Sequence, residues 1–180
     1  MTSHLVHVAL LLISSVLPLQ TAPQAGAQAG ANASQAVVLN ATEAAKALPS
    51  SVFFRGQSAS VQGRNSGGVQ FSKDSMMLAT LVDTSGYSSQ LQQKYQAYLI
   101  TEEPIEIGGH RLEPGAYGCG FVAGDLFLVM DIGGHDLFSV ASTRDAGLRR
   151  PTPLQVVAAP EGNQYRFYEG RSFVTFTQAH

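Results

Sequence analysis

The segment from Ile105 to Val140 constrains the fold more than any other part of this sequence of 180 residues. Its apolar runs alternate with glycine-containing turns at Gly108-Gly109, Gly124-Asp125 and Gly133-Gly134. Apolar runs joined by such short turns are typical of β-hairpins. We therefore expect consecutive antiparallel hairpins here, and the remaining strands must pack around them.

The first two turns predict which side chains face each other. With Gly108-Gly109 as a two-residue turn, apolar side chains meet on one face and opposite charges on the other, in the pairs Ile105–Leu112, Glu106–Arg111 and Ile107–His110. Such cross-strand pairs contribute ~0.2–1 kcal/mol each. With Gly124-Asp125 as the second turn, one face forms a predicted core from the pairs Phe121–Leu128, Cys119–Met130 and Tyr117–Ile132.

The opposite face of the second hairpin carries Gly118 and Gly120. Glycine inside a strand marks a bend, the close approach of another element, or space for a ligand. Both glycines are therefore candidate ligand or interaction residues, and so is Phe138 on the following strand. A barrel that binds an apolar small ligand behind residues 116–122 is one alternative for the function.

The third turn, Gly133-Gly134, pairs Val129 with Phe138 and Met130 with Leu137, and it sets Asp131 directly opposite Asp136. Like charges in this position destabilise a strand pair. Two adjacent carboxylates bind Ca²⁺ through their oxygens or share one proton with one pKa raised, so Asp131 and Asp136 are candidate metal-binding or hydrolytic residues. The alternative is a solvated hairpin end, or a contact with an arginine of the next loop. We prefer this alternative because turn ends are rich in aspartate, and we assign no cofactor.

Weaker patterns predict the elements before this segment. Asn40 and Glu43 have the spacing of a capping box, which predicts a short helix after Asn40. Residues 63–68 (GRNSGG) are expected to form a turn. Residues 88–94 are expected to form a short helix that continues into a strand at 95–102.

At the end of the chain, a hairpin with its turn at Glu169-Gly170 sets Tyr168 opposite Arg171 on the outward face. A ring and a guanidinium in contact form a cation–π pair, so Tyr168 and Arg171 are further candidate interaction residues. The whole chain holds about ten short strands at about 8–12-residue spacing. The predicted fold class is all-β, a mostly antiparallel meander forming a β-sandwich or small barrel, with one or two short peripheral helices.

Three regions are expected along the chain. Residues 1–27 are predicted to be a signal peptide, because the apolar run at 8–19 is too short to cross a bilayer and small residues with the form of a cleavage site follow it. Residues 28–39, rich in Ala, Gln and Gly, are predicted to be a disordered linker. Residues 40–180 are expected to form one β-rich domain, secreted or periplasmic and without a membrane span after signal removal.

Composition narrows the classes of partner. A formal net charge of −2 with 13% charged residues gives no reason to expect a nucleic acid partner. Cys119 is the single cysteine, and a secreted chain of this size without disulfides favours a bacterial periplasm or exterior. Its position in the middle of a strand predicts a buried thiol.

Signatures of catalysis are mostly missing: the sequence has no nucleophile elbow, zinc-protease motif or phosphate-binding loop. His110 and His135 follow glycine turns, but a meander places these turns at opposite ends of the sheet, so one shared metal is not expected. We therefore predict an exported, non-catalytic binding or interaction module with an unknown protein or small-molecule partner. The alternatives are a small hydrolase or Ca²⁺-binding protein centred on Asp131 and Asp136, and the ligand-binding barrel.

Overall fold

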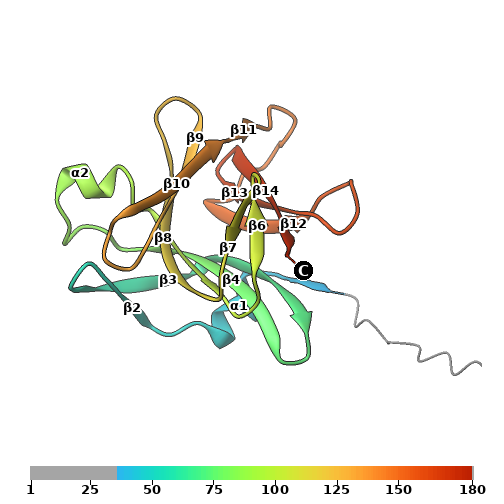
Figure 1. Cartoon of the computed structure of the whole chain (residues 1–180), viewed down its shortest axis with the longest axis horizontal. Coiled ribbons are helices and arrows are strands. Elements are labelled where there is room, and N and C mark those ends of the chain that lie inside the picture. The colour runs from blue at the N-terminus through green and yellow to red at the C-terminus, as the bar shows by residue number, and fades with distance from the viewer. Residues whose placement is uncertain (1–35, 180) are drawn as a thin grey trace, which may run out of the picture. The chain divides into compact units, whose positions relative to one another are not determined.

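The computed structural model describes residues 36–179, which fold into two antiparallel β-sheets (Figure 1). Strands account for 56% and helices for 8% of the structure, so the predicted all-β fold class is confirmed. The predicted signal peptide and most of the predicted linker lie outside the described residues.

The first sheet runs in the order β1-β3-β4-β5-β8-β9-β10, and β2 pairs with β3 alone. Its strands are β1 (Val37–Leu39), β2 (Ser51–Phe54), β3 (Gln57–Ser72), β4 (Ser75–Val82), β5 (Ala97–Thr101), β8 (Gly115–Val122), β9 (Leu126–Met130) and β10 (Asp136–Ala141). Residues 37–39 were expected to belong to the disordered linker. They instead form β1, because their backbone pairs with β3.

The second sheet runs in the order β12-β13-β14-β6-β7, and β11 pairs with β14. Its strands are β6 (Ile105–Ile107), β7 (His110–Leu112), β11 (Thr143–Arg144), β12 (Leu154–Ala158), β13 (Tyr165–Glu169) and β14 (Ser172–Gln178). The segment 105–140 is therefore not one continuous meander: its first hairpin joins the second sheet, and its later strands join the first.

The inner faces of the two sheets meet in one apolar core. Buried side chains come from both sheets, among them Met77, Leu99, Phe127, Phe167 and Phe176. No strand of one sheet pairs with a strand of the other within residues 36–179, so the architecture is a sandwich with open edges. Burial of this apolar area is the main favourable contribution to folding.

A second apolar cluster covers the outer face of the first sheet. The β2–β3 hairpin contributes Phe54, and the segment between α2 (Ser89–Gln92) and β5 contributes Tyr95. The two rings stack with their centroids 3.9 Å apart. Both faces of the first sheet are therefore buried over part of its area.

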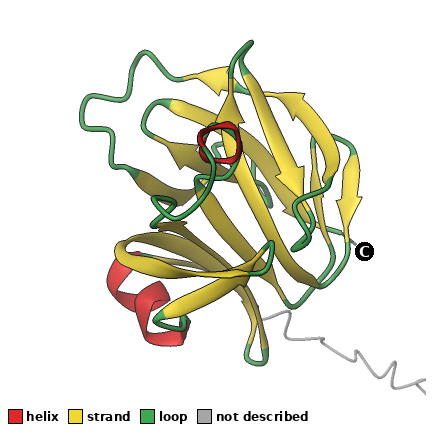
Figure 2. Cartoon of the chain, turned by 90° about the vertical axis from the view of Figure 1, so that its left-hand side faces the viewer, coloured by secondary structure: helices red, strands yellow, loops and turns green. Residues whose placement is uncertain are grey.

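Both predicted helices are present at the periphery, where Figure 2 shows them outside the sheets. In α1 (Ala41–Ala47) the capping box forms as predicted: the Asn40 side chain accepts hydrogen bonds from the backbone of Thr42 and Glu43, and the Glu43 carboxylate accepts one from the Asn40 N–H. The second predicted helix is shorter than expected and ends at Gln92.

The turn predicted at residues 63–68 is wrong, because β3 continues through it with an irregular register between Val61 and Ser66. Two glycines, Gly67 and Gly68, allow this path, because a Cβ at either position would collide with a neighbouring strand. A Cβ at Gly67 would lie 2.9 Å from the backbone N of Val156, so β3 can approach β12 only because that position has no side chain. The glycines therefore serve a close approach of strands and not a reversal of the chain.

The first hairpin has the predicted register, with Ile105 opposite Leu112. The second is shifted by one residue, since its loop has three residues and Phe121 faces Phe127. Val129, and not Met130, consequently shares the inner face with Cys119. The fully buried Cys119 confirms the predicted core position of the thiol.

Candidate functional site

Three large apolar side chains on neighbouring segments are exposed to solvent: Phe53 (61% exposed), Ile132 (52%) and Leu137 (48%). We refer to them as the apolar surface. Single exposed apolar residues are common, but several in neighbouring segments with a polar rim indicate a contact site for another molecule.

Strand alternation explains the exposure of Phe53. Its neighbours Val52 and Phe54 point into the outer cluster, so Phe53 must point away from it. The backbone of β2 is bound to the first sheet at this residue, because the Tyr98 hydroxyl of β5 donates a hydrogen bond of 3.3 Å to the Phe53 carbonyl. The phenyl ring is therefore presented to solvent on a fixed backbone.

Ile132 lies beside the end of β2. The backbone N–H of Arg55 donates a hydrogen bond of 2.7 Å to the Ile132 carbonyl. In Figure 1 the β2–β3 turn and the loop before β10 accordingly lie on the same side of the molecule. Segments that are about 80 positions apart in sequence are thus brought together at this point.

Leu137 is exposed because β10 contains a bulge. Asp136 pairs with Met130 and Phe138 pairs with Val129, which leaves Leu137 without a partner on β9. The predicted Val129–Phe138 pair is confirmed, and the predicted Met130–Leu137 pair is wrong. A β-bulge redirects a side chain in this way and bends its strand.

β10 is also the last strand of its sheet, so one of its edges is open. The Ser142 N–H donates to the Asp125 carbonyl, so the backbone groups of Ser139 and Ala141 point away from β9 by alternation. No strand of the described residues pairs with them. The strand contains neither lysine nor proline, the residues that commonly prevent unwanted pairing at an edge.

Asp131 and Asp136 form part of the polar rim and do not face each other. The Asp131 carboxylate accepts a hydrogen bond of 2.9 Å from the backbone N–H of His135, and it lies 2.9 Å from Nδ1 of the His135 ring. The hydrogen bond from the His135 backbone lowers the pKa of Asp131. Asp136 instead pairs with Lys94, with 2.6 Å between Oδ2 and Nζ. The predicted Asp131–Asp136 opposition is therefore wrong, because the bulge shifts the register at this end of the hairpin.

Gly118 and Gly120 lie against other parts of the same chain. A Cβ at Gly118 would lie 2.7 Å from Cζ of Phe54, and one at Gly120 would lie 2.5 Å from the Gln96 side-chain oxygen. Of the three readings of these glycines, the structure shows the close approach of another element. The space behind residues 116–122 is filled by Phe54, Tyr95 and Gln96 of the protein itself.

The remaining candidates are partly buried. Phe138 stacks on His110 with ring centroids 4.5 Å apart. Tyr168 is only 3% exposed, faces Phe173 and donates a hydrogen bond to Asp145. The predicted Tyr168–Arg171 pair is wrong because the turn lies at Gly170-Arg171.

The cation–π contact of this region is made by a different arginine. The Arg166 guanidinium carbon lies 4.6 Å from the centre of the Phe173 ring. Arg171 instead donates from Nε to the Leu148 carbonyl at 3.3 Å. These residues hold the outer face of the second sheet against the loop that follows β11.

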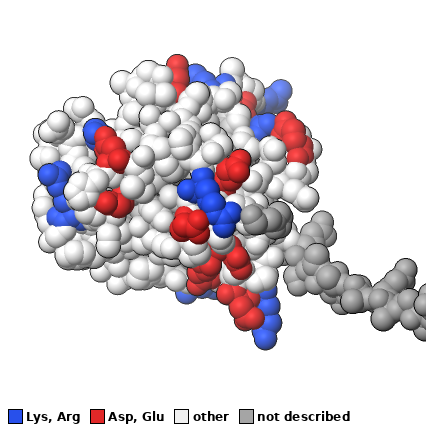
Figure 3. Space-filling model, viewed as in Figure 1, with Lys and Arg blue, Asp and Glu red and all other residues white. Residues whose placement is uncertain are grey.

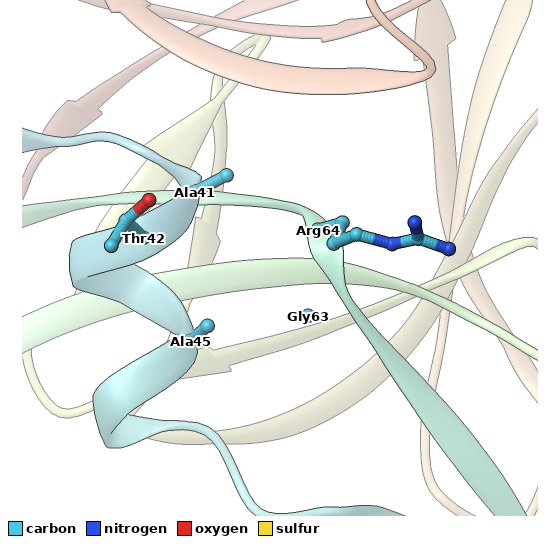
Figure 4. Close-up of a pocket in the computed structure, with 5 residues that line it drawn as sticks. All are labelled: Ala41, Thr42, Ala45, Gly63 and Arg64. Atoms are coloured by element: carbon cyan, nitrogen blue, oxygen red, sulfur yellow. The ribbon is translucent and has the colours of Figure 1, made fainter.

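A shallow hollow of about 510 Å³ lies between α1 and β3. Figure 4 shows Ala45 pointing toward Gly63, whereas the Arg64 side chain points away from the helix. The lining is small and mostly apolar, without converging polar groups that would orient a ligand. The hollow is therefore a weaker candidate than the apolar surface.

Charge does not mark a site on the face shown in Figure 3, where acidic and basic side chains are interspersed. Within residues 36–179, no group of three or more His, Cys, Asp or Glu side chains is placed to hold a metal ion. In the same part of the chain, no helix has the length and apolar character needed to span a membrane.

No protein-family model, curated protein or solved structure matches the chain. Function is therefore inferred from the geometry of the described residues. Sequence reasoning missed Phe53, Ile132 and Leu137, because an apolar residue in a strand is expected to face the core. Only the alternation within SVFF indicated that one of the two phenylalanines must point outward.

Proposed function

We propose that this chain is an exported, secreted or periplasmic, binding module that contacts a protein partner through the apolar surface and the open edge of β10. The observation that supports this most strongly is the position of Phe53, Ile132 and Leu137 on segments joined by a backbone hydrogen bond, next to an unpaired strand edge. An extended segment of a partner can add to such an edge through main-chain hydrogen bonds.

The chemistry of the surface favours binding over catalysis. Apolar area supplies affinity without a reacting group, while the rim of Arg55, Lys94 and Asp136 supplies charges that select and orient a partner. Arg55 lies directly over the loop before β10, since a Cβ at Gly134 would be 3.0 Å from its Cδ. The partner is expected to present apolar side chains alternating along an extended segment.

Site-specific photo-crosslinking in cells that export the protein tests this proposal. A photoreactive phenylalanine analogue replaces Phe53 or Leu137, and a matched control carries it at the exposed Asn163 in the β12–β13 loop. We expect both surface positions to give the same adduct of defined mass, and Ile132→Ser to weaken it. The absence of an adduct at both surface positions, or an identical adduct from position 163, would refute the proposal.

A further inference from the structure

Glu169 is a partly buried glutamate at one end of the inter-sheet core. It is the last residue of β13, and its side chain lies on the inner face because it alternates with Tyr165 and Phe167, which both pack in the core. Its cross-strand neighbours are Leu154 on β12 and Ser172 on β14. The carboxylate oxygen Oε2 is buried and has no hydrogen-bond partner.

The charged groups on the neighbouring elements have other contacts or other directions. On β13 itself, Arg166 points outward, to the Phe173 ring and the Glu161 carboxylate. On β11, Arg144 is exposed and pairs through its backbone with Ser172, the first residue of β14. Arg171 donates to the Leu148 carbonyl, and Asp145 accepts hydrogen bonds from Tyr168 and from the loop at 147–148. No described side chain forms an ion pair with Glu169.

Across the core, the titratable group that interacts with Glu169 is the thiol of Cys119 on β8. Cys119 is fully buried, and burial raises its pKa, with a further increase from the Glu169 charge. The thiol therefore stays protonated and neutral, and a thiol cannot supply a compensating positive charge in either protonation state. An ionised Glu169 would have to regain water to be stable.

We propose that ionisation of Glu169 opens this end of the sandwich, so that proton binding at this one carboxyl controls how tightly the β13–β14 end of the core is closed. Glu169 directly precedes the Gly170-Arg171 turn, so a displacement of the hairpin end suffices to expose the carboxylate. With the proton bound, the neutral group remains between the sheets. The inference is independent of the partner proposed above.

The direction of the pH effect follows from burial. Desolvation raises the pKa of Glu169 to about 7, whereas the ordinary value is 4.5. The folded state thus holds this proton more tightly than the unfolded chain. The stability gained from this tighter proton binding is fully present below the ordinary pKa of 4.5 and is lost as the pH rises through about 7.

Cys119 provides a direct readout, because it is the single cysteine of the sequence and lies in the core that would open. The rate of its modification by a maleimide is measured from pH 5.5 to 8.5 in the wild type and in Glu169→Gln. The buried thiol reacts only after the core opens and the thiol is hydrated, so the ratio of the two rates at each pH compares opening in the two proteins. Glu161→Gln, a substitution of an exposed glutamate, is the matched control.

We expect the wild-type rate relative to Glu169→Gln to rise by about tenfold or more over this range, since each pKa unit corresponds to about a tenfold change in an equilibrium constant. Glu161→Gln should follow the wild type. A constant ratio would overturn the proposal. If Glu169→Gln does not fold, a carbon-13 NMR titration of the Glu169 carboxyl in the wild type decides. A midpoint near the ordinary glutamate pKa refutes the inference. A midpoint near neutral pH, accompanied by changes in the chemical shifts of Cys119, supports it.

Discussion

Replacing Tyr95 by Phe is expected to stabilise the protein. The ring is fully buried and stacked on Phe54, and the substitution keeps this contact. Its hydroxyl is buried without a hydrogen-bond partner, and burial raises the pKa of the phenol, so the group stays neutral. Removing an unsatisfied hydroxyl eliminates a desolvation cost without removing a bond.

The magnitude follows from that cost. A buried polar group without a partner costs ~1–3 kcal/mol, and loss of one oxygen leaves only a small void. We expect the free energy of unfolding to increase by about 1 kcal/mol, which corresponds to about 2–4 °C in Tm for a domain of this size. Urea unfolding at pH 7, with an unchanged m-value, measures it.

Tyr87→Phe is the matched control, since Tyr87 packs edge-on against both Tyr95 and Phe54. Its hydroxyl lies 3.0 Å from the Phe54 carbonyl and 3.3 Å from that of Gln57, to either of which it can donate. This variant should lose about 1 kcal/mol, because an acceptor is left unpaired. If Tyr95→Phe destabilises the protein as much as Tyr87→Phe, the Tyr95 hydroxyl has a partner, such as a buried water, and the reasoning fails.

Three further predictions concern other parts of the chain. Gly118→Ala should destabilise the protein by about 1–3 kcal/mol through overpacking in the outer cluster. Gly147→Ala should be nearly neutral in thermal unfolding, because a Cβ there would make only an ordinary contact with the Asp145 carboxylate at 3.4 Å. Hydrogen bonding lowers the pKa of Asp131, so the stability that this carboxylate contributes is present at neutral pH and is lost as the pH falls through the lowered pKa. Asp131→Asn should therefore make the free energy of unfolding depend less on pH in the acid range, and an unchanged dependence would count against the contact. Cleavage of the predicted signal peptide should give a chain that begins within residues 23–33, and an intact mass that retains Met1 would contradict the proposed export.

The sequence was sufficient for the local features that depend on a few adjacent residues. The capping box at Asn40 needed only the residue types at fixed spacing. The register of the first hairpin was correct because Gly108 and Gly109 both adopt positive φ, which closes a two-residue turn. Alternation and glycine turns together were enough to predict an all-β fold.

Hairpin registers failed where the turn could be placed in more than one way. The loop at Gly124 and Asp125 takes three residues, and the last turn lies one residue later than expected. A shift of one residue reverses the face of every side chain of one strand relative to its partner. In the β9–β10 hairpin the register is instead shifted by the bulge at Leu137, which is why the Asp131–Asp136 pair did not form.

Only the tertiary structure decided what the candidate residues contact. Gly118 was recognised as a position of close approach, but the approaching ring, Phe54, is more than sixty positions earlier in the chain. Glu169 was expected in a turn and instead faces the core, where its carboxyl loses water. Period and turn chemistry are local properties of the chain, whereas desolvation and exposure depend on which strands the two sheets bring together.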